Sequence, residues 1–315
     1  MIYKKPRFWD FPNPNLFTYL LFPLTIPIRM NNFLLNNKSK IKSKDIFTIC
    51  VGNIYLGGTG KTPTAIKLNK ILTKYNLNVA IGRKFYPSHK DEIKILNEES
   101  NLLISSSRDK ILSLKNLNVE VIIFDDGLQD KKIDYDLKFV CFDCLNWIGN
   151  GLLIPAGPLR ENLKSLKKYD AVFLKNFTNS KKNIIKIIKK INHKIKIFFT
   201  NYKITNLNKF NFANKYLIFS GIGNPEDFKN ILIKNNIKII HEMIFPDHFD
   251  YKVDDLRKVK KLAKKYNAKI ITTEKDYVKL PKKERRGIDY IKIELIFKNQ
   301  KSLIHFIKKK INEKI

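Results

Sequence analysis

The feature that most constrains the fold is a glycine-rich stretch between an apolar run and an amphipathic segment. Residues 46–51 predict a buried strand, and residues 63–75 predict a helix that begins at Pro63. Between them lies Gly-Gly-Thr-Gly-Lys-Thr at residues 57–62. Glycines let successive backbone N–H groups turn toward one concavity, and a helix N-terminus adds partial positive charge. This order predicts a phosphate-binding loop rather than an ordinary glycine turn.

The loop departs from the usual spacing. The pattern G-x-x-x-x-G-K-[ST] requires a glycine five residues before Gly60, where this chain has Tyr55. We interpret the stretch as a variant loop, in which Lys61 reaches the β- and γ-phosphates of a nucleotide and the Thr62 hydroxyl ligates Mg²⁺. The residues predicted to bind the nucleotide are Gly57, Gly58, Thr59, Gly60, Lys61 and Thr62.

Short apolar runs alternate with longer amphipathic segments along most of the chain. The runs at 119–124, 138–142 and 171–174 are continuously apolar, which is typical of strands buried on both faces. The rhythm restarts near residue 216. We therefore expect an α/β fold of two lobes, with P-loop NTPase-like, mostly parallel sheets flanked by helices.

Three parts are expected along the chain. Residues 1–40 form an N-terminal membrane-associated segment, residues 41–180 the phosphate-binding core lobe, and residues 181–315 a second α/β lobe with linker strands near 195–205. The basic amphipathic segment 302–315 is expected to pack against a lobe, with a second membrane contact as the alternative.

The N-terminal segment combines basic and aromatic residues. Its apolar run from Leu16 to Ile28 is shorter than the roughly 20 residues that span a bilayer, and Pro23 and Pro27 interrupt it. Exposed aromatic side chains beside lysines fit a segment that lies in the membrane interface. The alternative is an apolar arm packed on the protein itself.

The chain is strongly basic, with a formal net charge of +32. Such a charge attracts nucleic acid, anionic membranes or acidic small molecules. Heavy use of Lys, Asn and Ile is also what an AT-rich genome produces, so the charge does not identify the partner. No nucleic-acid-binding motif is present and basic residues are spread along the whole chain. We therefore expect neither a nucleic-acid partner nor an obligate protein partner.

The three cysteines do not form a disulfide framework, because their number is odd and low for the length of the chain. Cys141 and Cys144 have the spacing of a redox or metal pair, but no second Cys or His pair lies nearby. We interpret them as the buried end of a strand. The compartment is expected to be reducing.

A second motif follows the apolar run at Val121–Phe124, where Asp125 and Asp126 stand at the strand's end. An apolar strand that ends in carboxylates, downstream of a phosphate-binding loop, is the Walker B arrangement. Either aspartate can face the Mg²⁺ held by Thr62, and the other can orient water or a neighbouring side chain.

A third motif, Gly-Asn-Gly-Leu-Leu-Ile-Pro-Ala-Gly-Pro-Leu-Arg-Glu at residues 149–161, is an apolar loop that ends in two charges. Arg160 is predicted to neutralise phosphate charge, whereas Glu161 either binds the metal or holds Arg160. The alternative is a buried turn with a surface ion pair.

Two further motifs lie in the expected second lobe. In Phe-Pro-Asp-His-Phe-Asp at residues 245–250, we expect His248 beside Asp247 to be a base or to orient one, and the alternative is a structural His-Asp pair. Thr-Thr-Glu-Lys-Asp at 272–276 is similar to the guanine-reading [NT]-K-x-D box, but Lys275 and Asp276 are adjacent, so GTP is not predicted.

In this order the motifs resemble those of the tetraacyldisaccharide 4'-kinases, the lipid A kinases of Gram-negative bacteria. The resemblance runs from residue 52 to about residue 280, over GNIYLGGTGKTP, DDGLQ, GNGLLIPAGPLRE, GIGNPEDF, FPDHFDY and TTEKDYVKL. It implies transfer of the ATP γ-phosphate to the 4'-hydroxyl of a tetraacylated glucosamine disaccharide 1-phosphate. It also implies a place at the cytoplasmic face of the bacterial inner membrane, against its anionic surface.

The resemblance also implies roles for individual residues. Asp91 and His248 would form a catalytic pair, Arg108 would contact the substrate or a phosphate, and Glu92 would contact the substrate. We expect Asp91 and His248 to come from different lobes, and our own hypothesis is that lobe closure brings them together. Two departures bear on the geometry: Asp130 stands where the family usually has His, and Gly82–Tyr86 replaces a Ser-Arg-Gly-Tyr stretch.

The competing hypothesis is a membrane-associated P-loop ATPase that acts as a partner switch. Such ATPases often carry a lysine at the start of the glycine loop, where this chain has Leu56. A nucleic-acid-binding function rests on charge alone.

Overall fold

The structure is a computed structural model that describes residues 6–27, 30, 40–86, 90–114, 117–247 and 249–314. The chain divides into two compact units. The larger unit comprises Lys5–Phe85, Leu96–Asn201 and Ile296–Ile315, and the smaller unit is made mainly of Tyr86–Ile95 and Tyr202–Leu295.

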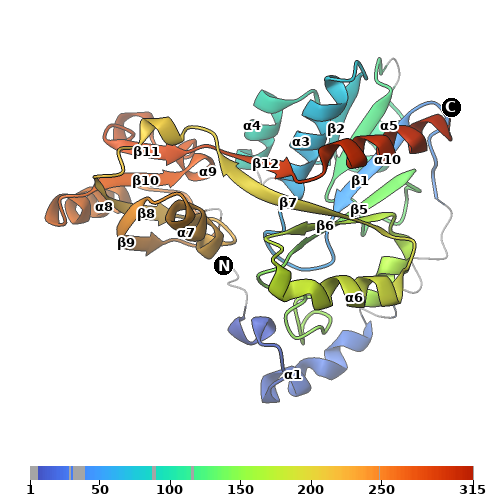
Figure 1. Ribbon diagram of the computed structural model, residues 1–315, viewed down its shortest axis with the longest axis horizontal. Helices are drawn as coiled ribbons and strands as arrows, with labels where there is room; N and C mark the ends of the chain where they lie inside the picture. The colour runs from blue at the N-terminus through green and yellow to red at the C-terminus, as the bar shows by residue number, and fades with distance from the viewer. Residues whose placement is uncertain are drawn as a thin grey trace. The chain divides into compact units, whose positions relative to one another are not determined.

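The larger unit is built on an eight-stranded sheet with the order β12-β7-β6-β5-β1-β4-β2-β3 (Figure 1). The pairings from β7 to β3 are all parallel. Its strands are β1 (Phe47–Gly52), β2 (Val79–Lys84), β3 (Leu102–Ser105), β4 (Val121–Asp125), β5 (Leu137–Asp143), β6 (Ala171–Lys175), β7 (Lys196–Ile204) and β12 (Ile293–Phe297).

The strand order positions the site. β1 lies between β4 and β5, and the strand order changes direction there: β2, β3 and β4 lie on one side of β1, and the connection from β4 crosses β1 to reach β5, β6 and β7 on the other. Such a switch point is where ligands bind at the carboxyl ends of parallel strands. Val51 pairs with Asp125 in register, so the start of the glycine loop lies beside the end of β4.

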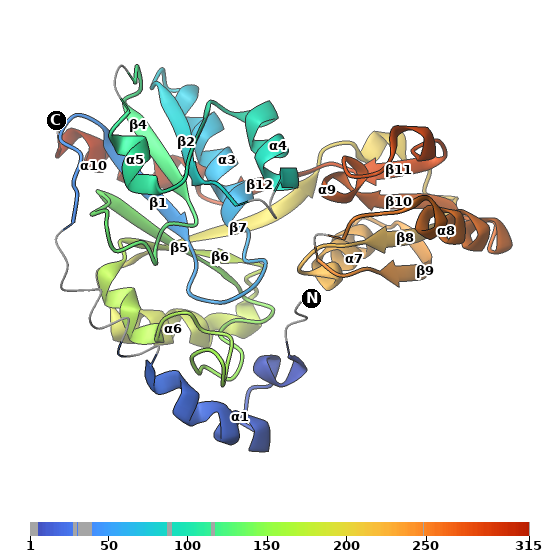
Figure 2. The ribbon, with the colours of Figure 1, turned by 180° about the vertical axis from the view of Figure 1, so that it is seen from behind.

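Helices cover both faces of this sheet, and alternate residues of β5 contact opposite layers. Cys141 lies within 4.0 Å of Thr64 in α3, and Phe139 contacts Phe306 in α10. Phe142 instead belongs to a core cluster that includes Ile188. Figure 1 shows α10 in front of the sheet, and Figure 2, the view from behind, shows α5 in front. Besides the N-terminal elements, the described helices of this unit are α3 (Lys61–Thr73), α5 (Arg108–Leu112), α6 (Lys182–Ile191), α10 (Gln300–Asn312) and the 3-10 helices η4 (Leu163–Lys168) and η5 (Asn179–Lys181).

The smaller unit repeats the layered plan with a four-stranded parallel sheet of order β11-β10-β8-β9. Alternate residues of β8 explain its two layers: Ile218 packs in a cluster with Leu232 of α7, and Leu217 in a cluster with Val259 of α8. Its elements are η6 (Leu207–Lys209), β8 (Lys215–Ser220), α7 (Pro225–Lys234), β9 (Lys238–Ile244), α8 (Val253–Lys265), β10 (Lys269–Thr273), α9 (Glu274–Tyr277), η7 (Lys282–Glu284) and β11 (Ile288–Ile291). The predicted α/β architecture is therefore confirmed.

The units divide the chain elsewhere than at residue 181. β7 is hydrogen-bonded to β6, with Thr200 opposite Lys175, and Phe306 of α10 packs on Phe198. These contacts tie α6, most of β7 and the C-terminal helix to the phosphate-binding unit. In the described chain, crossings between the units fall after β2 at Phe85 and within the helix α4 (Lys90–Glu99), β7 and β12.

The placement of Asp91 differs from the sequence-based hypothesis. Tyr86–Ile95 is assigned to the same unit as Tyr202–Leu295, the range that contains position 248. We therefore withdraw the hypothesis that Asp91 and His248 come from different lobes. His248 itself and the side chain of Asp91 lie outside the described residues.

The N-terminal segment contains the short elements η1 (Arg7–Asp10), α1 (Leu16–Leu21) and η2 (Phe22–Leu24). Within α1, Leu16, Phe17 and Leu20 are all more than 60% exposed, whereas Trp9 is buried. Among the described residues, no helix combines the length and apolar character needed to cross a bilayer. Contact with a membrane interface therefore stays a prediction for this segment.

All three cysteines are buried and free of disulfides. Burial raises the pKa of Cys141 to about 12 and that of Cys144 to about 12, so both thiols stay protonated near neutral pH. The interpretation of this pair as a buried strand end is confirmed.

The packing of α6 gives a matched test of the core. Ile188 is 0% exposed, and its neighbour Ile187 is 40% exposed. We expect Ile188→Ala to lower the free energy of unfolding by about 2–5 kcal/mol, because it removes buried methyl groups and leaves a cavity. Ile187→Ala should change it by less than about 0.5 kcal/mol. Denaturant unfolding measures both, and equal losses would contradict this packing.

Candidate active site

The glycine loop joins the end of β1 to the first residue of α3, as the sequence predicts. Gly57 has a φ of +150° and Gly60 a φ of +85°. A side chain at either position would be strained, because L-residues rarely adopt these angles. Gly60 directly precedes Lys61, so the loop delivers the lysine at the positively charged end of the helix.

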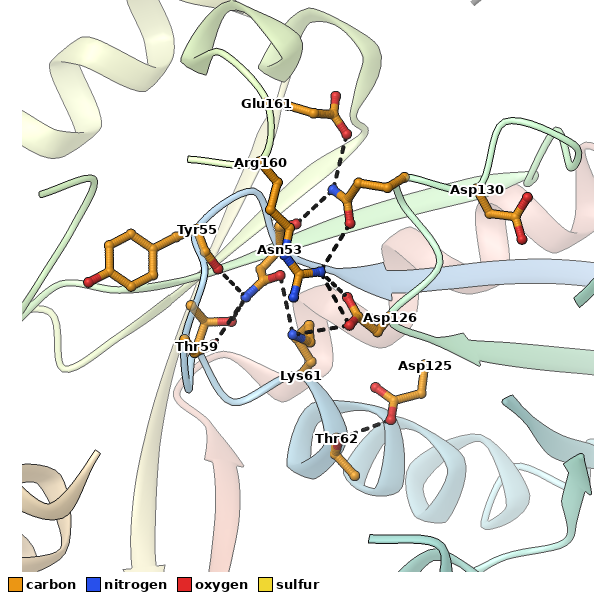
Figure 3. A network of polar contacts seen from close by, with 12 residues as sticks. Asn53, Tyr55, Thr59, Lys61, Thr62, Asp125, Asp126, Asp130, Arg160 and Glu161 are labelled. Carbon is orange, nitrogen blue, oxygen red and sulfur yellow. Dashed lines mark hydrogen bonds and ion pairs between the residues drawn. The ribbon is translucent and has the colours of Figure 1, made fainter. Parts of the chain in front are cut away.

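Asn53 holds the loop together, a role that the sequence analysis missed. Its side-chain amide donates to the Tyr55 carbonyl at 2.6 Å and to the Thr59 hydroxyl at 3.0 Å. Its side-chain oxygen accepts from Lys61 Nζ at 3.2 Å (Figure 3). Asn53 is fully buried, so these bonds fix the loop from within.

Tyr55 explains why the loop lacks the usual glycine. Its side chain is 2% exposed and packs with Leu153 and Leu159. Backbone bonds continue this contact, from Leu56 N to Pro158 O at 2.8 Å and from Arg160 N to Ile54 O at 2.7 Å. Residues 54–56, at the start of the glycine loop, are thus hydrogen-bonded to the loop that carries Arg160.

Asp125 faces the start of α3. Its Oδ2 accepts from the Thr62 hydroxyl at 2.9 Å and from Arg83 Nη1 at 2.7 Å. Asp125 is 1% exposed and Arg83 is 5% exposed, so this is a buried ion pair. Removing either partner would leave an uncompensated charge inside the protein.

Asp126 points a different way from its neighbour, because its φ of +55° turns the chain sharply at the end of β4. Its carboxylate lies 3.4 Å from Lys61 Nζ and accepts from Arg160 Nη1 at 3.1 Å (Figure 3). Burial by itself raises the pKa of Asp126, but the charges of Lys61 and Arg160 outweigh it and hold that pKa below its ordinary value.

Gln129 links Arg160 to Glu161. Its side-chain oxygen accepts from Arg160 Nη1 at 3.2 Å, and its amide donates to Glu161 Oε1 at 3.0 Å. Glu161 also accepts from the Tyr169 hydroxyl at 3.1 Å. Of the two roles predicted for Glu161, this geometry favours holding Arg160, through Gln129. Metal binding by Glu161 stays a prediction.

Arg108 lies beneath the turn at the end of β4. It is 5% exposed, donates to the backbone carbonyls of Asp125 and Asp126, and lies 3.6 Å from the Asp130 carboxylate. These contacts stabilise the turn that carries both aspartates. The substrate contact that the resemblance implied for Arg108 stays a prediction, as does that of Glu92, whose side chain lies outside the described residues.

In the smaller unit, the stretch at 272–276 that is similar to a guanine-reading box forms the N-terminus of α9. Asp276 is fully buried, and its Oδ2 accepts from Gly221 N at 3.0 Å and from the Thr273 hydroxyl at 2.7 Å. The Thr273 hydroxyl in turn accepts from Asp276 N at 3.0 Å, which caps the helix. Lys275 instead reaches Asp247 at 3.5 Å.

A divalent cation would find hard oxygen donors in the larger unit. The Thr62 hydroxyl and the Asp125 carboxylate, which meet at 2.9 Å, are oxygen donors of the type that Mg²⁺ prefers. Asp126, the other aspartate predicted as a ligand, lies against Lys61 and Arg160, and metal binding by it stays a prediction. Among the described residues, no group of three or more His, Cys, Asp or Glu side chains could hold a metal ion. This donor set fits Mg²⁺, which binds through one or two protein ligands together with substrate phosphates.

The comparison with known families decides the assignment. The model of the tetraacyldisaccharide-1-P 4'-kinases matches residues 17–103 and 91–312. The chain belongs to this family. Membership identifies it as a kinase, and the motifs quoted from the sequence fall within the matched residues.

Full-length relatives support the assignment. The chain is 45% identical over 314 residues to tetraacyldisaccharide 4'-kinase of Pelagibacter ubique (strain HTCC1062), covering 99% of both proteins. It is 36% identical over 293 residues to tetraacyldisaccharide 4'-kinase of Rickettsia canadensis (strain McKiel), covering 87% of each.

A solved structure shows that the kinase family's fold is shared. LpxK from Aquifex aeolicus, crystallised in complex with ATP, matches with a TM-score of 0.68 at 22% identity. The match covers 94% of this chain and 100% of that one. The α/β fold with P-loop topology is therefore that of the family.

The lowered pKa of Asp126 predicts a pH-dependent stability. A depressed carboxyl pKa stabilises the fold above the unfolded-state pKa, about 3.9, and this contribution is lost as the pH falls through the folded-state pKa. We expect the stability difference between the wild type and Asp126→Asn to shrink as the pH falls below about 4. Chemical denaturation at several pH values measures it. A difference that stays constant or grows on acidification would contradict the ion-pair assignment.

Proposed function

We propose that the chain transfers the γ-phosphate of ATP to the 4'-hydroxyl of a tetraacylated glucosamine disaccharide 1-phosphate, in lipid A biosynthesis. The observation that best supports this function is that Lys61 and Arg160 both form ion pairs with one carboxylate, Asp126, beside the N-terminus of α3. The family of the chain names the acceptor class.

Phosphoryl transfer depends on positioning and on neutralising charge, since there is little covalent chemistry for the protein to supply. Lys61 and Arg160 are the cations that would meet the transferring phosphoryl group. The backbone N–H groups of the glycine loop would hold the other phosphates. Asn53 and Gln129, which bond to these two cations, keep the donors in place before the reaction begins.

Thr62 and Asp125 are the residues that would hold Mg²⁺, because their side chains meet at 2.9 Å at the start of α3. When bound, the ion would neutralise charge on the β- and γ-phosphates. Asp126 is engaged with the two cations instead, and we assign it the role of orienting them.

The acceptor hydroxyl needs a base. The resemblance assigns this role to Asp91 and His248, and we retain it as a proposal. Both residues fall in ranges assigned to the smaller unit. A positioned base contributes typically 10²–10⁴-fold to such a step.

The acceptor is an acylated lipid, so the enzyme must work at a membrane. The exposed apolar side chains of α1 and the net charge of +32 suit the cytoplasmic, anionic face of an inner membrane. We infer a peripheral attachment through this segment.

The test is transfer of labelled phosphate from ATP to the acyl-disaccharide acceptor by the purified protein. We expect Asp91→Ala and His248→Ala each to lower kcat by about 10²-fold or more, with little change in ATP affinity. Glu98→Ala on α4 and His305→Ala on α10 are matched controls, because both residues are exposed.

Near-normal rates in both Asp91 and His248 variants would show that the base is misassigned. ATP hydrolysis without any labelled lipid would instead favour an ATPase that switches partners.

A further inference from the structure

The N-terminal segment docks on the active-site loops through Trp9. The Trp9 carbonyl accepts from Asn150 N at 2.9 Å, and its indole N–H donates to the Pro155 carbonyl at 2.9 Å. A Cβ at Gly149 would lie 2.1 Å from the Trp9 carbonyl oxygen, so this approach requires glycine. Trp9, which is 7% exposed, thus contacts the loop that ends in Arg160 at two points, Asn150 and Pro155.

The next residue reaches the glycine loop itself. Asp10 Oδ1 accepts a hydrogen bond from the Tyr55 hydroxyl at 2.5 Å. Burial, followed by this hydrogen bond, raises the pKa of Tyr55 far above its ordinary value, so the phenol stays a donor. Tyr55 stands where the usual loop pattern has glycine, and a glycine could not make this contact.

Two short routes therefore connect the segment to the reacting groups. One runs from Trp9 through residues 149–159 to Arg160, whose guanidinium bonds to Asp126. The other runs from Asp10 through Tyr55 to Asn53, which accepts from Lys61. Both end at a cation that would meet the transferring phosphoryl group.

We propose that Trp9 and Asp10 are positioning residues for phosphoryl transfer, which tie the N-terminal segment to the glycine loop and to Arg160. The proposal rests on the proposed function. The segment would then do more than attach the protein to a membrane. α1, which begins six residues after Asp10, carries the exposed apolar side chains. Attachment through α1 would therefore be linked to the positions of Lys61 and Arg160.

A double-mutant cycle on Asp10 and Tyr55 tests the link. Asp10→Asn and Tyr55→Phe are each expected to lower kcat by about 2- to 10-fold, the range of one hydrogen bond, while the KM for the acceptor stays unchanged. The double variant should lose no more than the larger single loss, because both changes remove one interaction. Trp9→Phe, which removes the indole N–H, should also lower kcat at constant acceptor KM.

Asn13→Ala is the control, since Asn13 is exposed and lies three residues beyond Asp10. It should retain wild-type kcat. Circular dichroism verifies that each conservative variant is folded. Losses that add fully in the double variant, or variants that match the wild type, would overturn the proposal. Absence of lipid phosphorylation by the wild type would overturn the proposed function instead.

Discussion

The site depends on one carboxylate that gathers two cations. Lys61 comes from the start of α3 and Arg160 from a loop a hundred residues later, and both lie against Asp126. Without that carboxylate the two cations would repel each other in a partly buried setting, and no opposite charge would hold the two loops together. The same two cations lower the pKa of Asp126, because they favour its charged form. A phosphate would meet cations that are already held in place, which is the preorganisation on which phosphoryl transfer relies.

The sheet makes this gathering possible. β1 has β4 on one side and β5 on the other, so the glycine loop, the paired aspartates and the long loop after β5 all emerge at one edge. Backbone hydrogen bonds between Ile54–Leu56 and Pro158–Arg160 then join two of these loops. A buried ion pair, Arg83 with Asp125, fixes the third. Rigid strands thus supply the positions, and a few polar side chains supply the alignment.

The sequence predicted the elements whose signals are local. Continuous apolar runs marked β4, β5 and β6, and the helix expected at 63–75 is α3, Lys61–Thr73, so its bounds were off by two residues at each end. β3 was missed because it is four residues long and only half-buried. The unit boundary was misplaced because β7 pairs with β12, some ninety residues later, and such pairings leave no local signal. Asn53 and Gln129 were overlooked for the same reason, since their value lies in partners that only the fold brings together. Adjacent Asp125 and Asp126 could not be told apart until the turn at Asp126 separated their directions.

We expect the turn at residues 57–62 to receive the terminal phosphates of a nucleotide, with Lys61 as their principal cation. Calorimetric titration of the purified protein with ATP and Mg²⁺ tests it most directly. We expect saturable binding to a single site, and an affinity at least about tenfold weaker for Lys61→Ala, since a charge-assisted hydrogen bond contributes about 1.5–3 kcal/mol. Equal affinity in the two proteins, or no binding heat in the wild type across several temperatures, would contradict it.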